Sequence, residues 1–167
     1  MKISVLGAGG WGTTLGILLH YNGHQVTLWE YKKNYVKELI KKRINSIYLP
    51  GVPIPEEISI THDLKESVHQ KNLIVLAVPS QFLRSVIEDV SYSDIKNSIL
   101  VSVAKGIENK HLMTMSQMLK DVHPNLSDGQ IGVLSGPSHA EEVCKRIPTA
   151  VVAASTEHET SKSIQAA

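Results

Sequence analysis

The chain has 167 residues, and its 17 lysines and arginines nearly balance its 16 aspartates and glutamates, which leaves a formal net charge of +1. This balance argues against general nucleic-acid binding, no apolar run has the length of a membrane span, and the first apolar run is too short for a signal peptide. The length suits one domain over residues 1–167 and the single cysteine fits a reducing compartment, so we expect a cytoplasmic protein with no nucleic-acid partner and no membrane insertion.

The beginning of the chain holds its strongest pattern. An apolar run at 3–6 stops at Gly7, as a buried parallel strand should. Gly7, Gly9 and Gly12 form G-x-G-x-x-G, and the apolar residues that follow recur at helical density until Asn22-Gly23 ends the helix. Gly9 would let a pyrophosphate approach the backbone, and the helix N-terminus would attract it. The stretch therefore predicts a dinucleotide site, with an ordinary glycine-rich turn as the alternative.

Residues 25–29 predict a second strand, and Glu30 follows it where an acidic residue would bond the adenosine ribose. Lys32 lies two residues later. An acid at this point favours NAD and a cation favours the 2′-phosphate of NADP, so the preference stays open, and a solvated acid at a helix start is the alternative for Glu30. A basic amphipathic helix is expected at 33–44. Its expected buried side chains are Tyr35, Val36, Leu39 and Ile40.

The prolines and the glycine between residues 48 and 55 predict an ordered loop without regular structure. Beyond it, strands and helices alternate. Strands are expected at 58–61, 73–78, 98–103, 131–134 and 149–154, and helices at 63–69, 80–87, about 110–122, 140–146 and 156–167. The alternation predicts a Rossmann-like, doubly wound α/β fold, which is a mainly parallel sheet with helices on both faces.

In such folds ligands bind at the carboxyl ends of the strands. That rule brings together the segments at 7–12, 79–81, 105–106 and 135–140, with Pro79 expected at the cofactor. Lys105, a cation just past a central strand and followed by glycine, suits a phosphate or a developing alkoxide; a surface lysine is the alternative. The last segment precedes a helix start, which also suits an anion, and simple capping by Ser138 is a compatible alternative.

Two other patterns carry no chemistry. His20 and His24 have the spacing of a metal pair, but Asn22-Gly23 breaks the helix that would align them, so we expect no metal site. Ser138 and His139 are neighbours in the sequence and cannot form a nucleophile–base pair.

Taken together, these residues resemble the N-terminal domain of bacterial NAD(P)-dependent glycerol-3-phosphate dehydrogenase. The matching segments are Gly-Ala-Gly-Gly-Trp-Gly at 7–12, Tyr-Leu-Pro at 48–50, Ala-Val-Pro-Ser at 77–80, Ala-Lys-Gly-Ile at 104–107 and Leu-Ser-Gly-Pro-Ser-His-Ala-Glu-Glu at 134–142. The resemblance implies reversible hydride transfer between NAD(P)H and dihydroxyacetone phosphate, which gives sn-glycerol 3-phosphate for phospholipid synthesis.

The resemblance also implies roles for single residues. It adds further cofactor contacts, namely Gly10, Trp11, Tyr31, Lys32 and Ala140. It places Lys105 against both cofactor and substrate, as an electrostatic assistant, and it places Gly136 and Ser138 against the substrate. Glu30 beside Lys32 departs from the commoner pattern and leaves a preference for NADP in doubt.

This family has a second, all-helical domain, which supplies the lysine that donates or accepts the proton and groups that grip the substrate phosphate. The chain stops at Ala167, inside an expected helix, so we expect a cofactor-binding half with little or no turnover alone, and a homodimer in the full-length enzyme. The alternatives are a dinucleotide-sensing or partner-binding module without chemistry, and a related two-domain dehydrogenase acting on a 3-hydroxy acid, ketopantoate or a sugar acid.

Overall fold

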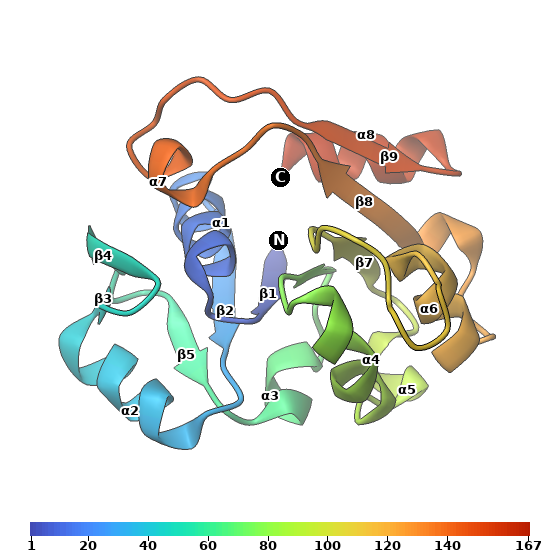
Figure 1. Ribbon diagram of the computed structural model, residues 1–167, viewed down its shortest axis with the longest axis horizontal. Helices are drawn as coiled ribbons and strands as arrows, with labels where there is room; N and C mark the ends of the chain where they lie inside the picture. Colours follow the sequence, from blue (N-terminus) through green and yellow to red (C-terminus); the bar gives the residue numbers. More distant parts are fainter.

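The computed structural model describes residues 1–167 and is built on a seven-stranded sheet with the order β5-β2-β1-β6-β7-β8-β9 (Figure 1). Its strands are β1 (Lys2–Leu6), β2 (Gln25–Trp29), β5 (Ser59–Thr61), β6 (Leu73–Leu76), β7 (Ile99–Ser102), β8 (Ile131–Ser135) and β9 (Val152–Ser155). All neighbouring pairs are parallel except β8 and β9, which are antiparallel. The predicted Rossmann-like, mainly parallel sheet is therefore confirmed.

Helices cover both faces of this sheet. They are α1 (Gly10–Tyr21), α2 (Lys33–Lys42), α3 (Leu64–Val68), α4 (Ser80–Glu88), α5 (Tyr92–Ile95), α6 (Met115–Val122), α7 (Ala140–Val143) and α8 (His158–Ala166). The strands supply side chains alternately to two buried clusters, so that Val5 belongs to one and Leu6 to the other. The first cluster includes α1, α2 and α8, and the second includes α3, α4, α5 and α6. No helix is both long enough and apolar enough to cross a membrane.

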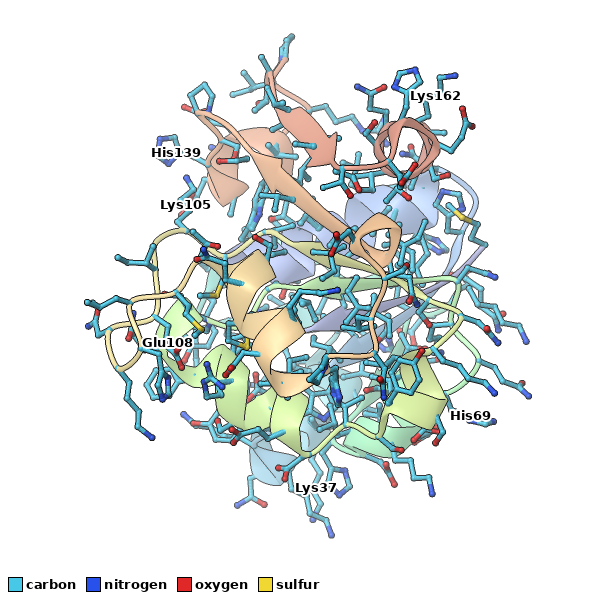
Figure 2. All side chains as sticks on the ribbon, turned by 90° about the vertical axis from the view of Figure 1, so that its right-hand side faces the viewer. Lys37, His69, Lys105, Glu108, His139 and Lys162 are labelled. Carbon is cyan, nitrogen blue, oxygen red and sulfur yellow. The ribbon has the colours of Figure 1, made fainter.

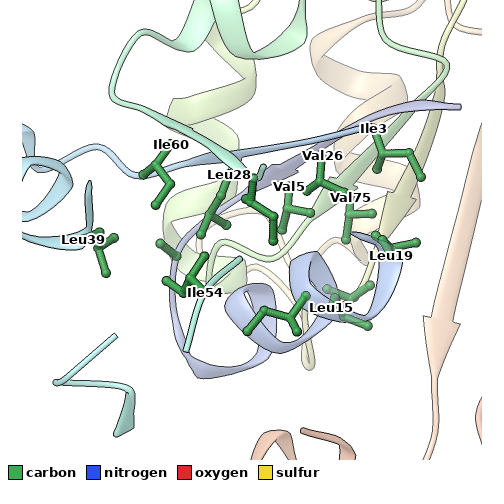
Figure 3. Packing of buried hydrophobic residues seen from close by; sticks show 14 of the residues in the cluster. Ile3, Val5, Leu15, Leu19, Val26, Leu28, Leu39, Ile54, Ile60 and Val75 are labelled. Atoms are coloured by element: carbon green, nitrogen blue, oxygen red, sulfur yellow. The ribbon is translucent and has the colours of Figure 1, made fainter. Parts of the chain in front are cut away.

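Helix α1 lies directly on the centre of the sheet. Leu15 and Leu19 pack against β-branched side chains of the central strands, including Ile3 and Val26 (Figure 3). Ile3 is fully buried and the two leucines are at most 7 % exposed. Burying one such side chain stabilises a fold by about 1.5–3 kcal/mol, so this contact fixes α1, and with it the turn after β1, on the sheet.

The order of the strands reverses next to β1. From β1 the chain first builds β2 and β5 on one side, and then returns to place β6, β7 and β8 on the other. The loops that leave β1 and β6 therefore separate at the carboxyl edge, where α/β sheets form their ligand crevice.

The segment at 48–55 differs from its prediction as an irregular loop. Strand β4 (Leu49–Pro53) pairs antiparallel with β3 (Ile44–Asn45) in a separate two-stranded ribbon. A ribbon of two strands leaves the outer N–H groups of each strand free, so proline can be accommodated there. The expected burial of Ile40 is also wrong, because α2 buries only Tyr35, Val36 and Leu39, and Ile40 is 47 % exposed.

Two helices in the C-terminal half are shorter than predicted. Helix α6 begins at Met115 and not near residue 110, because Thr114 and Gln117 form a capping box there. Helix α7 spans only Ala140–Val143 and does not reach residue 146. Helix α4 begins at Ser80, as predicted, and Pro79 is its N-cap.

Candidate functional site

A cavity of about 330 Å³ lies at the carboxyl edge of the sheet, between the segments that follow β1, β6, β7 and β8. The predicted site residues that line it are Trp11, Pro79, Lys105, Ser138 and Ala140. These residues are up to 129 positions apart in the sequence and meet only because parallel strands end at one edge. The structure thus brings together all four segments that the strand-end rule selects.

The glycines of the turn after β1 have different physical roles. Gly7 has φ +109°, and a Cβ there would lie 2.9 Å from the backbone of Ala77 and Val78. A Cβ on Gly12 would overlap the carbonyl oxygen of Gly7. These two glycines let strand and helix approach each other. At Gly9, by contrast, nothing lies within 4 Å of the position of a Cβ.

The open space at Gly9 fits a pyrophosphate. Gly9 is the N-cap of α1 and no side chain bonds to the N–H groups of the first turn. Those N–H groups have no partner inside the helix and carry a partial positive charge. An anion can therefore approach the start of α1 without meeting a side chain at Gly9, which is the condition that a bound dinucleotide sets.

Gly10 is constrained by the β3–β4 ribbon. A Cβ at Gly10 would lie 2.7 Å from the carbonyl oxygen of Tyr48. The ribbon is held there by Asn45, which is fully buried and donates hydrogen bonds to Ala8 O at 2.8 Å and to Thr13 Oγ1 at 2.7 Å. Asn45 could not be identified from the sequence, because no local pattern marks an asparagine whose partners lie more than 30 residues away.

Lys105 is the only lysine or arginine among the residues that line the cavity. Its Nζ donates a hydrogen bond to Ser138 O at 3.3 Å, which joins the loop after β7 to the loop after β8. Figure 2 shows Lys105 and His139 at the same edge of the molecule. A cation here offers its charge to an anionic group that enters the cavity.

The residues that follow β8 differ in their burial and in their position relative to the cavity. Ser138 is 7 % exposed and does not cap the following helix, whose N-cap is His139, so the capping alternative is wrong. Ala140 accepts a hydrogen bond from Thr14 Oγ1 at 3.3 Å and so ties α7 to α1. Gly136 does not line the cavity. A Cβ at this residue would lie 2.6 Å from Ala150 O.

Glu30, Tyr31 and Lys32 lie outside this cavity, at the carboxyl end of β2. Glu30 is 6 % exposed, whereas Tyr31 is 66 % exposed. Lys32 lines a second cavity of about 510 Å³ together with Tyr48 and other residues of α2 and the ribbon. Of the three residues predicted near the adenosine, only Lys32 therefore lines this second hollow, and the hollow is separate from the cavity at the strand ends.

An ion-pair network holds the loop that carries Lys105. Arg84 of α4 bonds both oxygens of Glu108, at 2.5 Å and 3.1 Å, and reaches Asp121 of α6 at 2.7 Å. His111 lies 2.9 Å from the same carboxylate. Glu108 is 4 % exposed. This network could not be identified from the sequence either, since its members belong to different elements and share no spacing.

The network predicts a stability that depends on pH. The hydrogen bonds from Arg84, and secondarily from His111, lower the pKa of Glu108 from 4.5 to about 2. A carboxyl group with a depressed pKa stabilises the fold above its unfolded pKa, and that contribution disappears as the pH falls through the folded value. In thermal melts, Glu108→Gln should therefore melt several degrees below the wild type at pH 6, and the difference should shrink between about pH 4.5 and pH 2.

Glu88→Gln is the matched control for this experiment. Glu88 ends α4, is exposed and forms no ion pair. Its replacement should leave the melting temperature unchanged across the same pH range. A Glu108→Gln protein that melts with the wild type at pH 6 would show that the network contributes no net stability.

The chain matches the family model described as NAD-dependent glycerol-3-phosphate dehydrogenase N-terminus over residues 2–161. It is 51 % identical over 155 residues to a glycerol-3-phosphate dehydrogenase [NAD(P)+] of Thermoanaerobacter sp., a match that covers 93 % of this chain and 46 % of the relative. It is 48 % identical over 170 residues to the protein of the same name from Chlorobium phaeobacteroides, which covers 100 % of this chain and 50 % of that one.

A solved structure has the same fold. The crystal structure of glycerol-3-phosphate dehydrogenase from Coxiella burnetii superposes with a TM-score of 0.90 at 32 % identity, covering 98 % of this chain and 49 % of that chain. The chain thus spans about half the length of the curated relatives it matches.

Proposed function

Because the chain belongs to the family of the NAD-dependent glycerol-3-phosphate dehydrogenase N-terminus, we propose that it is the nucleotide-binding half of an oxidoreductase. The reaction proposed is reversible hydride transfer between NAD(P)H and dihydroxyacetone phosphate, which gives sn-glycerol 3-phosphate. We place this activity in the cytoplasm, where the one cysteine of the chain would stay reduced.

The observation that carries this proposal is the cavity between Trp11 and Lys105. It lies at the point where the strand order reverses, it adjoins the open N-terminus of α1, and one lysine, Lys105, lines it. Its remaining lining is largely apolar, with Val78 and Val103 from the ends of β6 and β7. An apolar wall with one charged group excludes water from a reacting carbon and strengthens the field of that charge.

The nucleotide supplies the hydride when it is bound, and the protein residues have three proposed tasks. The first turn of α1 would hold the pyrophosphate above Gly9. Trp11 and Pro79 would enclose the reactive end. The Lys105 ammonium would attract the substrate phosphate, or stabilise the ketone oxygen as it gains negative charge during reduction. The proton for that oxygen is proposed to come from the part of the relatives that this chain does not match.

A nucleotide sensor with the same fold is the competing proposal. A sensor has no need of a cation beside the reactive end of the nucleotide. Lys105 lines the cavity proposed for that end, in a loop fixed by the Arg84–Glu108 network, and this supports the enzyme over the sensor.

Calorimetric titration of this chain with NADH, with and without dihydroxyacetone phosphate, tests the proposal. NADH should bind, and dihydroxyacetone phosphate should tighten its binding. In Lys105→Ala the effect of dihydroxyacetone phosphate should be lost, while the affinity for NADH should change by less than about threefold. Lys110→Ala is the control, because Lys110 is exposed in the same loop and does not line the cavity.

Each outcome bears on a different part of the proposal. If the chain binds neither NADH nor NADPH, the proposed nucleotide site is overturned. Binding of NADH that dihydroxyacetone phosphate leaves unchanged would overturn the proposed role of Lys105 in attracting the substrate. Turnover by this chain at the rate of a complete dehydrogenase would contradict its role as one half of the enzyme.

A further inference from the structure

Glu30 is a nearly buried carboxylate without a cationic partner. It is 6 % exposed, and its Oε1 accepts one hydrogen bond, from the backbone N–H of Lys32 at 3.1 Å. Its Oε2 accepts none, and no lysine, arginine or histidine forms an ion pair with it. Oε2 is not one of the enclosed side-chain atoms that lack a partner, so it still reaches the surface and can accept a hydrogen bond from a ligand.

The position of Glu30 shows where such a hydrogen bond would come from. The N–H of Gly7 donates to Trp29 O at 2.9 Å, which joins the end of β2 to the glycine-rich turn. Glu30 is the next residue along the chain. The N–H of Glu30 donates to Thr61 O at 3.0 Å, which fixes the backbone on its other side. A pyrophosphate at the start of α1 would leave its adenosine ribose next to this residue.

The nearby lysines are placed less favourably for a second phosphate. Lys32 and Lys33 are both exposed. The Lys32 ammonium lies over the ring of Tyr31, 5.3 Å from its centroid. Solvent and salt screen the field of an exposed ammonium group, whereas the field of a nearly buried carboxylate is screened much less. Glu30 therefore outweighs the lysines that follow it.

We propose that Glu30 makes this site selective for NAD(H) over NADP(H), an inference that rests on the nucleotide site of the proposed function. The two carboxylate oxygens would accept hydrogen bonds from the 2′- and 3′-hydroxyl groups of the adenosine ribose. The 2′-phosphate of NADP has no hydroxyl to donate at that position, and its negative charge would face Glu30 at close range.

Parallel calorimetric titrations with NADH and NADPH test this inference on the unchanged chain. NADH should bind about tenfold or more tightly than NADPH at physiological salt. Glu30→Gln keeps an oxygen for the N–H of Lys32 but removes the charge, so it should weaken NADH binding, strengthen NADPH binding and bring the two affinities within about threefold.

Glu88→Gln is the matched control. Glu88 is exposed at the end of α4 and lines neither the cavity at the strand ends nor the hollow beside Lys32. Its replacement removes the same charge and should leave the ratio of the two affinities unchanged. Equal binding of both nucleotides to the wild type, or a Glu30→Gln ratio like that of the wild type, would overturn the selectivity alone. Binding of neither nucleotide to the wild type would overturn the nucleotide site and this inference together.

Discussion

Replacement of Gly12 with alanine is expected to lower the free energy of unfolding by at least about 3 kcal/mol. The added methyl group would overlap the carbonyl oxygen of Gly7 and lie 3.0 Å from the Cβ of Ala77. Overpacking costs about 1–3 kcal/mol where side chains can adjust. Here the blocking atom belongs to the backbone of a tight turn, and α1 is held on the sheet along its length, so neither side can yield cheaply. Urea denaturation followed by circular dichroism measures the loss.

Gly16→Ala provides the control in the same helix. Gly16 is buried like Gly12, but the nearest neighbours of its Cβ position are Val26 Cγ1 at 3.8 Å and Val5 Cγ2 at 4.0 Å, which is ordinary contact. Alanine favours a helix over glycine by about 1 kcal/mol, so this variant should be as stable as the wild type or more so. Equal stability of Gly12→Ala and the wild type would contradict the close approach of α1 to the turn.

The central part of the fold could be predicted because local and long-range constraints agree there. The run at 3–6 is apolar, β-prone and followed by glycine, and β1 and α1 form as expected. The prolines at 50 and 53 show the limit of that reasoning. They exclude a central strand, and the sequence cannot show that an edge ribbon stacked on the start of α1 has room for them.

Some residues of the candidate site could likewise be predicted from the sequence and others could not. Residues at strand ends could be identified, because the carboxyl edge of a parallel sheet gathers them whatever the loops do. Residues that hold these loops could not, since Asn45 and Arg84 act through partners far away in the sequence. Whether Glu30 or Lys32 sets the proposed nucleotide preference depends on which of them is buried. Their positions two residues apart in the sequence do not show that Glu30 is buried and Lys32 exposed.

Gly9→Ala should have the opposite effect to Gly12→Ala, with binding lost and stability kept. Gly9 has φ −69° and ψ −179°, a conformation that alanine adopts without strain, and a Cβ there would meet no atom within 4 Å. The melting temperature should therefore stay within about 2 °C of the wild type. The same empty space is what the pyrophosphate would use, so the methyl group should weaken NADH binding by at least about tenfold, or 1.4 kcal/mol.

Calorimetry and thermal melts on one preparation of Gly9→Ala separate the two effects. A protein that melts with the wild type but no longer binds NADH would mean that the space above Gly9 belongs to the ligand and not to the fold. A folded Gly9→Ala that binds NADH with unchanged affinity would remove the start of α1 from the nucleotide site. The contrast with Gly12 matters because both glycines belong to one pattern, yet the structure assigns packing to Gly12 and leaves open space at Gly9.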